Sequence, residues 1–295
     1  MKLLVFGSLN IDHVYQLPHF VRDGETIAST RYDRHSGGKG LNQAIALAKA
    51  GQDVCFGGAI GADGLFLKEL LAEYGVDTQP IRTLDVPTGH ALIQVDADGR
   101  NCIILYGGAN QAITPEMIRE TLSSLEAGDL ILLQNEISHG DEIIREAAAR
   151  GIQIALNPSP FTDELLKWPL DKVTWFILNE VEGADMTGET DPDRILDRML
   201  ALWPDCRIVL TLGVQGSMYA DQKQRIFQPA VKAHAVDTTA AGDTFTGYFL
   251  HAVLEGKEIA FALKEAASAS AITVSRPGAA QSIPLLKEVR KHEGA

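Results

Sequence analysis

The sequence has little of several features that mark particular classes of protein. It contains 3 cysteines in 295 residues, and Cys55, Cys102 and Cys206 are far apart and in no Cys-x-x-Cys spacing. A disulfide framework is therefore not expected, and a reducing cytoplasm is the expected location. No apolar run approaches the 18 or so residues of a membrane span, and the apolar start Met1–Phe6 predicts a buried strand rather than a signal peptide.

Positive charge is also scarce. The chain carries 26 Lys and Arg against 39 Asp and Glu, a net charge of −13. This balance argues against nucleic acid and against anionic membranes as partners, and an anionic substrate would need a locally basic pocket. Apolar residues make up 45% of the chain, which is the composition of a soluble globular protein.

Two common phosphate-binding loops are missing as well. The chain has no GxxxxGK[ST] loop and no GxGxxG after a strand. If the protein is a kinase, it is neither of the P-loop type nor of the protein-kinase type.

Short apolar runs alternating with helical segments predict an α/β fold with a mostly parallel central sheet flanked by helices. The expected strands are Leu3–Gly7, Val54–Ile60, Leu130–Leu133, Ile152–Leu156, Trp175–Leu178 and Arg207–Thr211, with another after Ala230. The expected helices follow the glycine turn in Gly37–Ala50 and span Asp63–Tyr74, Asp141–Arg150, Glu180–Met186, Pro192–Leu202, Gly242–Glu255 and Ile259–Val274, with a short one after Pro284.

Two segments break this alternation. Residues 11–35 and 88–106 are rich in alternating residues and turn signals, and the second predicts a hairpin that turns at Asp98-Gly99. We interpret them as one small β-sheet inserted into a single domain of residues 1–295, where it forms a lid over a pocket. The alternative is that they are edge strands of the main sheet.

The segment Asp237–Asp243 followed by Thr244–Leu250 carries the strongest chemical signal. Small residues form a tight turn, and a helix begins beside the carboxylate of Asp243. The first backbone N–H groups of a helix lack intrahelical partners and attract anions. A base beside a phosphate cradle suits phosphoryl transfer to an alcohol.

Other polar residues follow predicted strands or glycine turns. Lys39 and Asn42 in the turn Gly37–Ala44 offer donors to hydroxyls, with a plain glycine-rich turn as the alternative. Asn10 and Asp12 after the first strand suit hydrogen bonds to vicinal hydroxyls, with turn capping as the alternative. Glu136 follows a strand and has the alternative of an ordinary surface glutamate. Asn179–Glu182 follows another strand and has the spacing of a capping box, and the functional alternative is that it helps to hold Mg²⁺. The glycine turn Thr211–Gly216 also follows a strand and suits a nucleotide.

Together these segments resemble the PfkB family of carbohydrate kinases, and within it the ribokinases, nearly from end to end. The two family signatures match Gly37–Ala44 and Asp237–Tyr248, and further similar segments are Gly7–Asp12, Gly107–Asn110, Leu156–Pro160 and Arg276–Ala279. The resemblance implies a ribokinase-like (Rossmann-like) α/β body with a β-sheet lid, and a homodimer in which two lids pack together.

The resemblance also implies roles for individual residues. Asp243 matches the catalytic base, and the anion hole matches Ala240, Ala241 and Gly242. The sugar-binding positions match Asn10, Asp12, Gly38, Lys39, Asn42 and Glu136, with Asp243. The nucleotide positions match Asn179, Thr211, Gly213, Gly216 and Gly242, and the magnesium-associated motif matches Asn179 and Glu182. A monovalent cation site matches Asp237, Thr239, Thr273, Arg276, Gly278 and Ser282. Ala267 stands where relatives often carry Asn or His near the adenine.

The activity implied is phosphorylation of the primary hydroxyl of D-ribose by ATP, with Mg²⁺ and K⁺, to give D-ribose 5-phosphate. The closest alternative is a kinase of deoxyribose, another small sugar or a nucleoside. A catalytically silent sugar or nucleotide sensor is the alternative of a different class, and the intact Asp243 turn argues against it.

Overall fold

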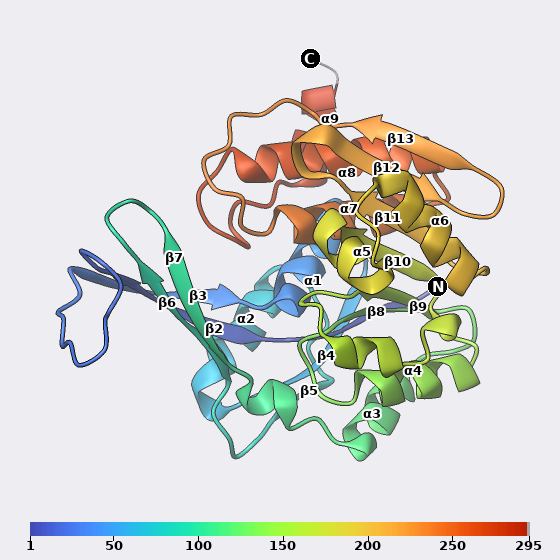
Figure 1. Cartoon of the computed structure of the whole chain (residues 1–295). Helices are drawn as coiled ribbons and strands as arrows, with labels where there is room; N and C mark the ends of the chain where they lie inside the picture. Colours follow the sequence, from blue (N-terminus) through green and yellow to red (C-terminus); the bar gives the residue numbers. More distant parts are fainter. Residues whose placement is uncertain (294–295) are drawn as a thin grey trace.

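A nine-stranded sheet lies at the centre of the molecule, in the order β13-β12-β11-β10-β9-β8-β1-β4-β5. The computed structural model describes residues 1–293 (Figure 1). Neighbouring strands from β5 to β11 are parallel, and β12 and β13 continue the sheet in antiparallel pairs. The strands are β1 (Leu3–Phe6), β4 (Val54–Ile60), β5 (Ile81–Thr83), β8 (Leu130–Gln134), β9 (Gln153–Asn157), β10 (Trp175–Asn179), β11 (Arg207–Thr211), β12 (Gly216–Ala220) and β13 (Arg225–Pro229).

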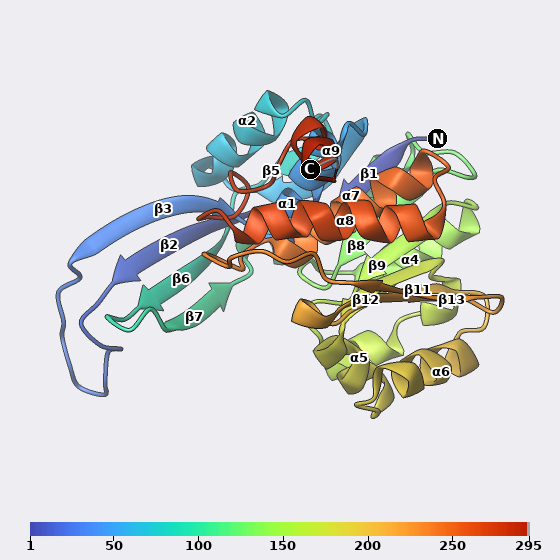
Figure 2. The same cartoon turned by 90° about the horizontal axis from the view of Figure 1, so that it is seen from above.

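Helices cover both faces of this sheet, which is why strands such as β1 and β8 are apolar, apart from Gln134 at the end of β8. One face packs against α1 (Lys39–Ala50), α2 (Leu65–Glu73), α7 (Ala241–Leu254), α8 (Ile259–Val274) and α9 (Leu286–Glu293). The other packs against α3 (Pro115–Leu122), α4 (Gly140–Ala149), α5 (Glu180–Thr187) and α6 (Pro192–Leu202). Figure 2 shows the two helical layers on either side of the sheet.

A second sheet of four strands projects from this body as an arm (Figure 1). Its order is β3-β2-β6-β7, with β2 parallel to β6 and the other pairs antiparallel. The strands are β2 (Asn10–Gln16), β3 (Arg31–Gly37), β6 (Gly89–Val95) and β7 (Asn101–Tyr106). The prediction that segments 11–35 and 88–106 form one small sheet is confirmed. The alternative, that they are edge strands of the main sheet, is wrong.

Helices α1 and α7 pack closely enough to bring their first turns together. A β-carbon at Gly247 of α7 would lie 2.5 Å from Cβ of Ala46 on α1, so only glycine allows this approach. Asn42 and Gln43 in the first turns of α1 thereby reach Asp243 in the first turn of α7.

Several predicted elements need correction. The strand expected after Ala230 is absent, because the last strand, β13, ends at Pro229 and residues 231–240 form an irregular loop. Strands β5, β12 and β13 and helix α3 were not predicted. The other expected strands and helices are present with shifts of one to a few residues at their ends, and the hairpin turns at Asp98-Gly99 as expected. Among residues 1–293, no helix combines the length and the apolar character that a bilayer crossing requires.

Candidate active site

The carboxyl ends of the parallel strands meet at one edge of the sheet, where open α/β sheets place their ligands. Strands β9, β10 and β11 end there in the polar residues Asn157, Asn179 and Thr211, and β1 and β8 are followed two residues later by Ser8 and Glu136. The small sheet begins at the same edge, because β2 follows β1 after only three residues.

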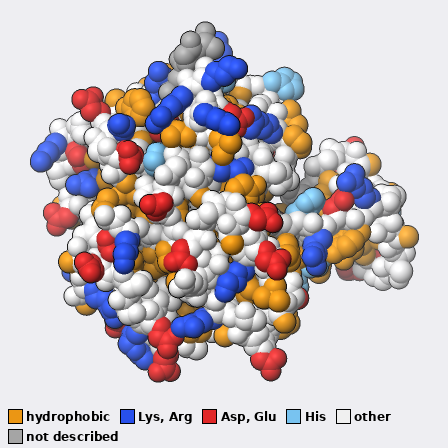
Figure 3. All heavy atoms as spheres, turned by 180° about the vertical axis from the view of Figure 1, so that it is seen from behind, with side chains coloured by type: hydrophobic (Ala, Val, Ile, Leu, Met, Phe, Trp, Pro, Cys, Tyr) orange, Lys and Arg blue, Asp and Glu red, His pale blue; other side chains and the backbone are white. Residues whose placement is uncertain are grey.

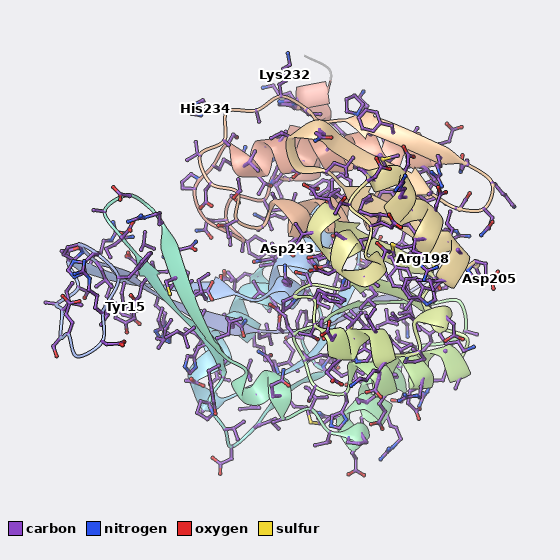
Figure 4. All side chains as sticks on the ribbon, viewed as in Figure 1. Tyr15, Arg198, Asp205, Lys232, His234 and Asp243 are labelled. Atoms are coloured by element: carbon purple, nitrogen blue, oxygen red, sulfur yellow. The ribbon has the colours of Figure 1, made fainter. Side chains whose placement is uncertain are left out.

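Asp243 lies at this edge, in the first turn of α7, and its side chain is buried. Figure 4 shows it in the middle of the molecule, whereas Tyr15 lies out on the small sheet. The turn before it places Ala240 in the left-handed region, at φ 59° and ψ 10°. This conformation costs an alanine about 1 kcal/mol or more, and such strain is common at functional sites. The turn aims the first N–H groups of α7 at the space in front of Asp243.

A hollow of about 440 Å³ opens in front of this turn. Its lining includes Lys39, Asn157, Asn179, Glu182, Thr211, Gly213, Thr238, Ala240, Ala241, Gly242 and Asp243. The structure thus brings the predicted anion hole and most predicted nucleotide positions together. Gly216 does not line the hollow, because it begins β12 and faces β13.

Ala267 does not line the hollow either, because it packs in the core between α8 and its neighbours. Ser270, about one turn further along α8, is closer to the site, since its Oγ donates to the carbonyl oxygen of Ala241 at 3.1 Å.

Asn179 and Glu182 form a complete capping box on α5. The backbone N–H of Glu182 donates to Oδ1 of Asn179 at 2.9 Å, and that of Asn179 donates to Oε2 of Glu182 at 3.1 Å. The structural reading of this motif is confirmed. Within residues 1–293 no group of three or more His, Cys, Asp or Glu could hold a metal ion.

The predicted sugar positions meet on the other side of Asp243. The carboxylate of Asp12 lies against the backbone of Gly37, where a β-carbon would be 2.2 Å from its Oδ2. Glu136 accepts hydrogen bonds from the hydroxyl of Ser8 and, at 2.9 Å, from the backbone N–H of Lys39. Burial and the nearby charge of Glu136 raise the pKa of Asp12 to about 6. Burial also raises the pKa of Glu136. Among residues 1–293 no cation lies within salt-bridge distance of either carboxylate, although the charge of Lys39 opposes the rise in the pKa of Glu136, so hydroxyl donors would stabilise both charges.

Several residues of this region were missed as parts of the site. Asn110 donates to Oδ1 of Asn10 at 2.8 Å, which leaves the amide NH₂ of Asn10 to face a ligand. Ser8, Gln43, Gln134 and Asn157 also belong to the polar network. Asn110 and Asn157 stand in segments that resemble the family, and Gln134 ends a buried strand, so those positions carried a signal.

The predicted cation positions lie on two segments that the structure joins. Oδ2 of Asp237 accepts from the backbone N–H of Gly278 at 2.9 Å, and its Oδ1 accepts from both N–H and hydroxyl of Thr239 at 2.9 and 2.6 Å. Burial opposes the charge of Asp237, yet these hydrogen bonds hold its pKa below the usual value. The backbone N–H of Arg276 donates to the carbonyl of Thr273. The hydroxyls of Thr273 and Ser282 donate to the carbonyl oxygens of Ala269 and Ala279 at 3.1 and 2.7 Å.

Comparison with known proteins agrees with this geometry. Residues 1–286 match the family described as pfkB family carbohydrate kinase. A ribokinase of Haemophilus influenzae is 37% identical over 299 residues, covering 97% of this chain and 96% of that protein. A deoxyribokinase of Salmonella typhi is 30% identical, covering 99% and 98%. The structure of an Arabidopsis thaliana ribokinase complexed with ribose and ATP matches with a TM-score of 0.84 at 31% identity, covering 99% and 98%.

Proposed function

Since the chain belongs to the pfkB family of carbohydrate kinases, we propose that it transfers the γ-phosphoryl group of ATP to the primary hydroxyl of D-ribose, giving D-ribose 5-phosphate. One observation carries this proposal. The buried carboxylate of Asp243 lines the hollow that fits a nucleotide, and its charge also acts on Glu136, which in turn acts on Asp12. A polyol and a polyphosphate would therefore meet at this carboxylate.

In the proposed reaction Asp243 takes the proton of the primary hydroxyl while that oxygen attacks the γ-phosphorus and ADP departs. The transferring phosphoryl group carries spread negative charge, which needs fixed donors more than covalent chemistry. The backbone N–H groups of Ala240 and Gly242, with that of Ala241, which here bonds to the carbonyl of Thr238 at 3.3 Å, would supply these donors at the start of α7. Preorganised donors in a buried site stabilise the charge without reorganising during the step.

Several of the side chains proposed to hold the sugar already make hydrogen bonds within the site. Asp12 and Glu136 accept from sugar hydroxyls, and Asn10 and Asn42 donate to them. Gly38 lets the turn pass close to the backbone of Ser8 and Asn10, and Lys39 lines the hollow on the phosphate side. The side chains assigned to the sugar, Asn10, Asp12, Lys39, Asn42 and Glu136, are all polar, which favours a small polyol over a nucleoside.

The nucleotide phosphates occupy the hollow lined by Asn179, Thr211 and Gly213. When bound, Mg²⁺ neutralises charge on the phosphates. Asn179 and Glu182 support it through water, because their capping box uses one oxygen of each side chain. This chain's own contribution is to position the phosphates against the N-terminus of α7.

A monovalent cation is proposed beside the anion hole, at Asp237, Thr239 and the loop that contains Gly278. The ionised carboxylate of Asp237 links this loop to the turn before α7, so cation binding would order the anion hole. We expect K⁺ to activate several-fold more than Na⁺, because carbonyl ligands in a site of this kind suit the larger ion. Initial rates in potassium and sodium chloride of equal ionic strength test this, and equal rates in both salts would contradict it.

The small sheet is proposed to act as a lid over the sugar and as the contact of a homodimer. Its strand β7 exposes Ile103, Ile104, Leu105 and Tyr106, each with about half or more of its surface accessible. Figure 3 shows hydrophobic surface on this projecting sheet. A contiguous apolar surface on an edge strand is usually covered by a partner.

We place the reaction in the cytoplasm, where ATP is available and the three free thiols stay reduced.

The sugar itself is tested by comparing kcat/KM for ribose, deoxyribose, fructose and adenosine with ATP and Mg²⁺. Ribose is expected to give the highest value. A higher value for deoxyribose would favour the alternative that the Salmonella typhi relative represents. Tight sugar binding without release of ADP for any sugar would favour a sensor and contradict the proposed function.

A further inference from the structure

A chain of buried amides leads from the sheet to the Asp243 carboxylate. Nε2 of Gln43 donates to Oδ1 of Asp243 at 2.9 Å and to Oδ1 of Asn157 at 3.1 Å, so both of its amide hydrogens are used. Oε1 of Gln43 accepts from Nε2 of Gln134 at 2.6 Å. Gln43 and Gln134 are almost completely buried, and they come from α1 and from the end of β8.

The negative charge on Asp243 determines which way each side-chain amide in this hydrogen-bonded series is turned. If Gln43 were turned over, its Oε1 would face the carboxylate and the Oδ1 of Asn157, and its NH₂ would face the NH₂ of Gln134. Asn157 is itself anchored, because its Nδ2 donates to the carbonyl of Ile177 at 2.8 Å. Hydrogen bonds at both Nε2 and Oε1 therefore hold the amide of Gln43 in one orientation.

The second oxygen of the carboxylate is held differently. Oδ2 of Asp243 accepts only from Nδ2 of Asn42, at 3.1 Å, and the buried Oδ1 of Asn42 has no hydrogen-bond partner. Asn42 is thus anchored on one side and can turn toward a ligand, whereas Gln43 cannot. Oδ1 of Asp243 thus has a hydrogen-bond donor that is fixed in place, whereas the donor to Oδ2 can turn away.

We propose that Gln43 is a positioning residue that holds Oδ1 of Asp243, so that Oδ2 is the oxygen that takes the proton of the sugar hydroxyl. This inference rests on the proposed function, in which Asp243 is the base. The O–H bond of the sugar breaks as its proton moves to Oδ2, the sugar oxygen bonds to the γ-phosphorus, and the bond to ADP breaks. Asp243 becomes a neutral acid whose Oδ1 keeps the hydrogen bond from Gln43.

The test compares four proteins: the native chain, Gln43→Met, Asp243→Asn and the double variant. Methionine keeps the length of the side chain and removes both hydrogen-bonding ends. We expect Gln43→Met to lower kcat by about 10- to 100-fold, the loss typical of a displaced reacting group, with the KM for ribose unchanged. In the Asp243→Asn background the same change should lower the residual kcat no further, because Gln43 acts through Asp243.

The outcomes separate the inference from the function on which it rests. A native kcat in Asp243→Asn would overturn the base itself. A fall in kcat for Asp243→Asn together with a kcat within twofold of native for Gln43→Met would overturn only the role of Gln43. An equal loss from Gln43→Met in both backgrounds would also overturn it, since that shows a general structural effect.

Two further variants guard against a folding defect. Gln134→Met leaves Gln43 in place but removes the donor to its Oε1, and we expect a smaller loss of kcat that also disappears in the Asp243→Asn background. If Gln43→Met does not fold, a native kcat in Gln134→Met overturns the inference. Gln153→Met is the matched control, because its amide donates to Gly128 at the opposite end of β9, and native kcat is expected.

Discussion

Substituting Asp243→Asn is expected to lower kcat by about 10²- to 10⁴-fold, the usual contribution of a general base. The amide has nearly the shape of the carboxylate but cannot take the proton of a sugar hydroxyl. Its oxygen can still accept from Gln43. Its new NH₂ group would face Asn42, whose Oδ1 has no partner and can accept after the Asn42 amide turns. The fold and sugar binding should therefore stay close to native.

The measurement is steady-state ADP release, together with sugar affinity by calorimetry and the midpoint of thermal unfolding. A large fall in kcat with sugar affinity within about threefold of native supports the role of Asp243 as base. Unchanged kcat would exclude that role. Loss of sugar binding and of thermal stability together would instead show that Asp243 mainly holds α1 and α7 together.

Substituting Asp12→Asn is expected to lower kcat/KM by about 10²-fold at pH 8, since hydrogen bonds to a charged group contribute about 1.5–3 kcal/mol. The native enzyme should also show a pH dependence that this variant lacks. Burial and Glu136 raise the pKa of Asp12 to about 6, so the carboxyl is neutral below that pH. Sugar hydroxyls donate to the ionised form, so sugar affinity rises as the pH rises through about 6 and levels off above it.

With this pKa, sugar affinity at pH 5 should be roughly tenfold lower than at pH 8. Calorimetric titration with ribose between pH 5 and 8 measures it without interference from the chemical step. In Asp12→Asn the affinity should be low and nearly flat across this range. If the variant keeps the native pH dependence, the titrating group is Glu136, whose pKa burial also raises, rather than Asp12.

The parts of the fold that could be predicted are those with a strong local pattern. Strands β1, β8 and β10 are buried on both faces and are apolar up to the polar residues that end β8 and β10, which makes them visible in the sequence. Strand β5 has three residues and a single buried side chain, Ile81, so it exists only because β4 pairs with it. Strand β13 alternates between exposed and half-buried residues at the sheet edge and ends in Pro229, which weakens its pattern.

Helix α3 is different, because its start signals were present and were overlooked. Thr114 caps it by accepting from the backbone N–H of Met117, and Pro115 occupies its first turn. Threonine followed by proline is a common start of a helix. The sequence therefore contained enough information to predict α3.

The sequence by itself determined the local chemistry of the site. The small residues of the turn at 237–242 and the helix after them place Asp243 beside an anion cradle, and this depends only on neighbours in the chain. Only the tertiary structure decided what surrounds that carboxylate. Gln43 is 200 positions from Asp243 and 114 positions from Asn157 along the chain, yet its hydrogen bonds to both are about 3 Å long. A hydrogen bond depends on distance in space, and packing of α1 on α7 sets that distance where spacing along the chain cannot.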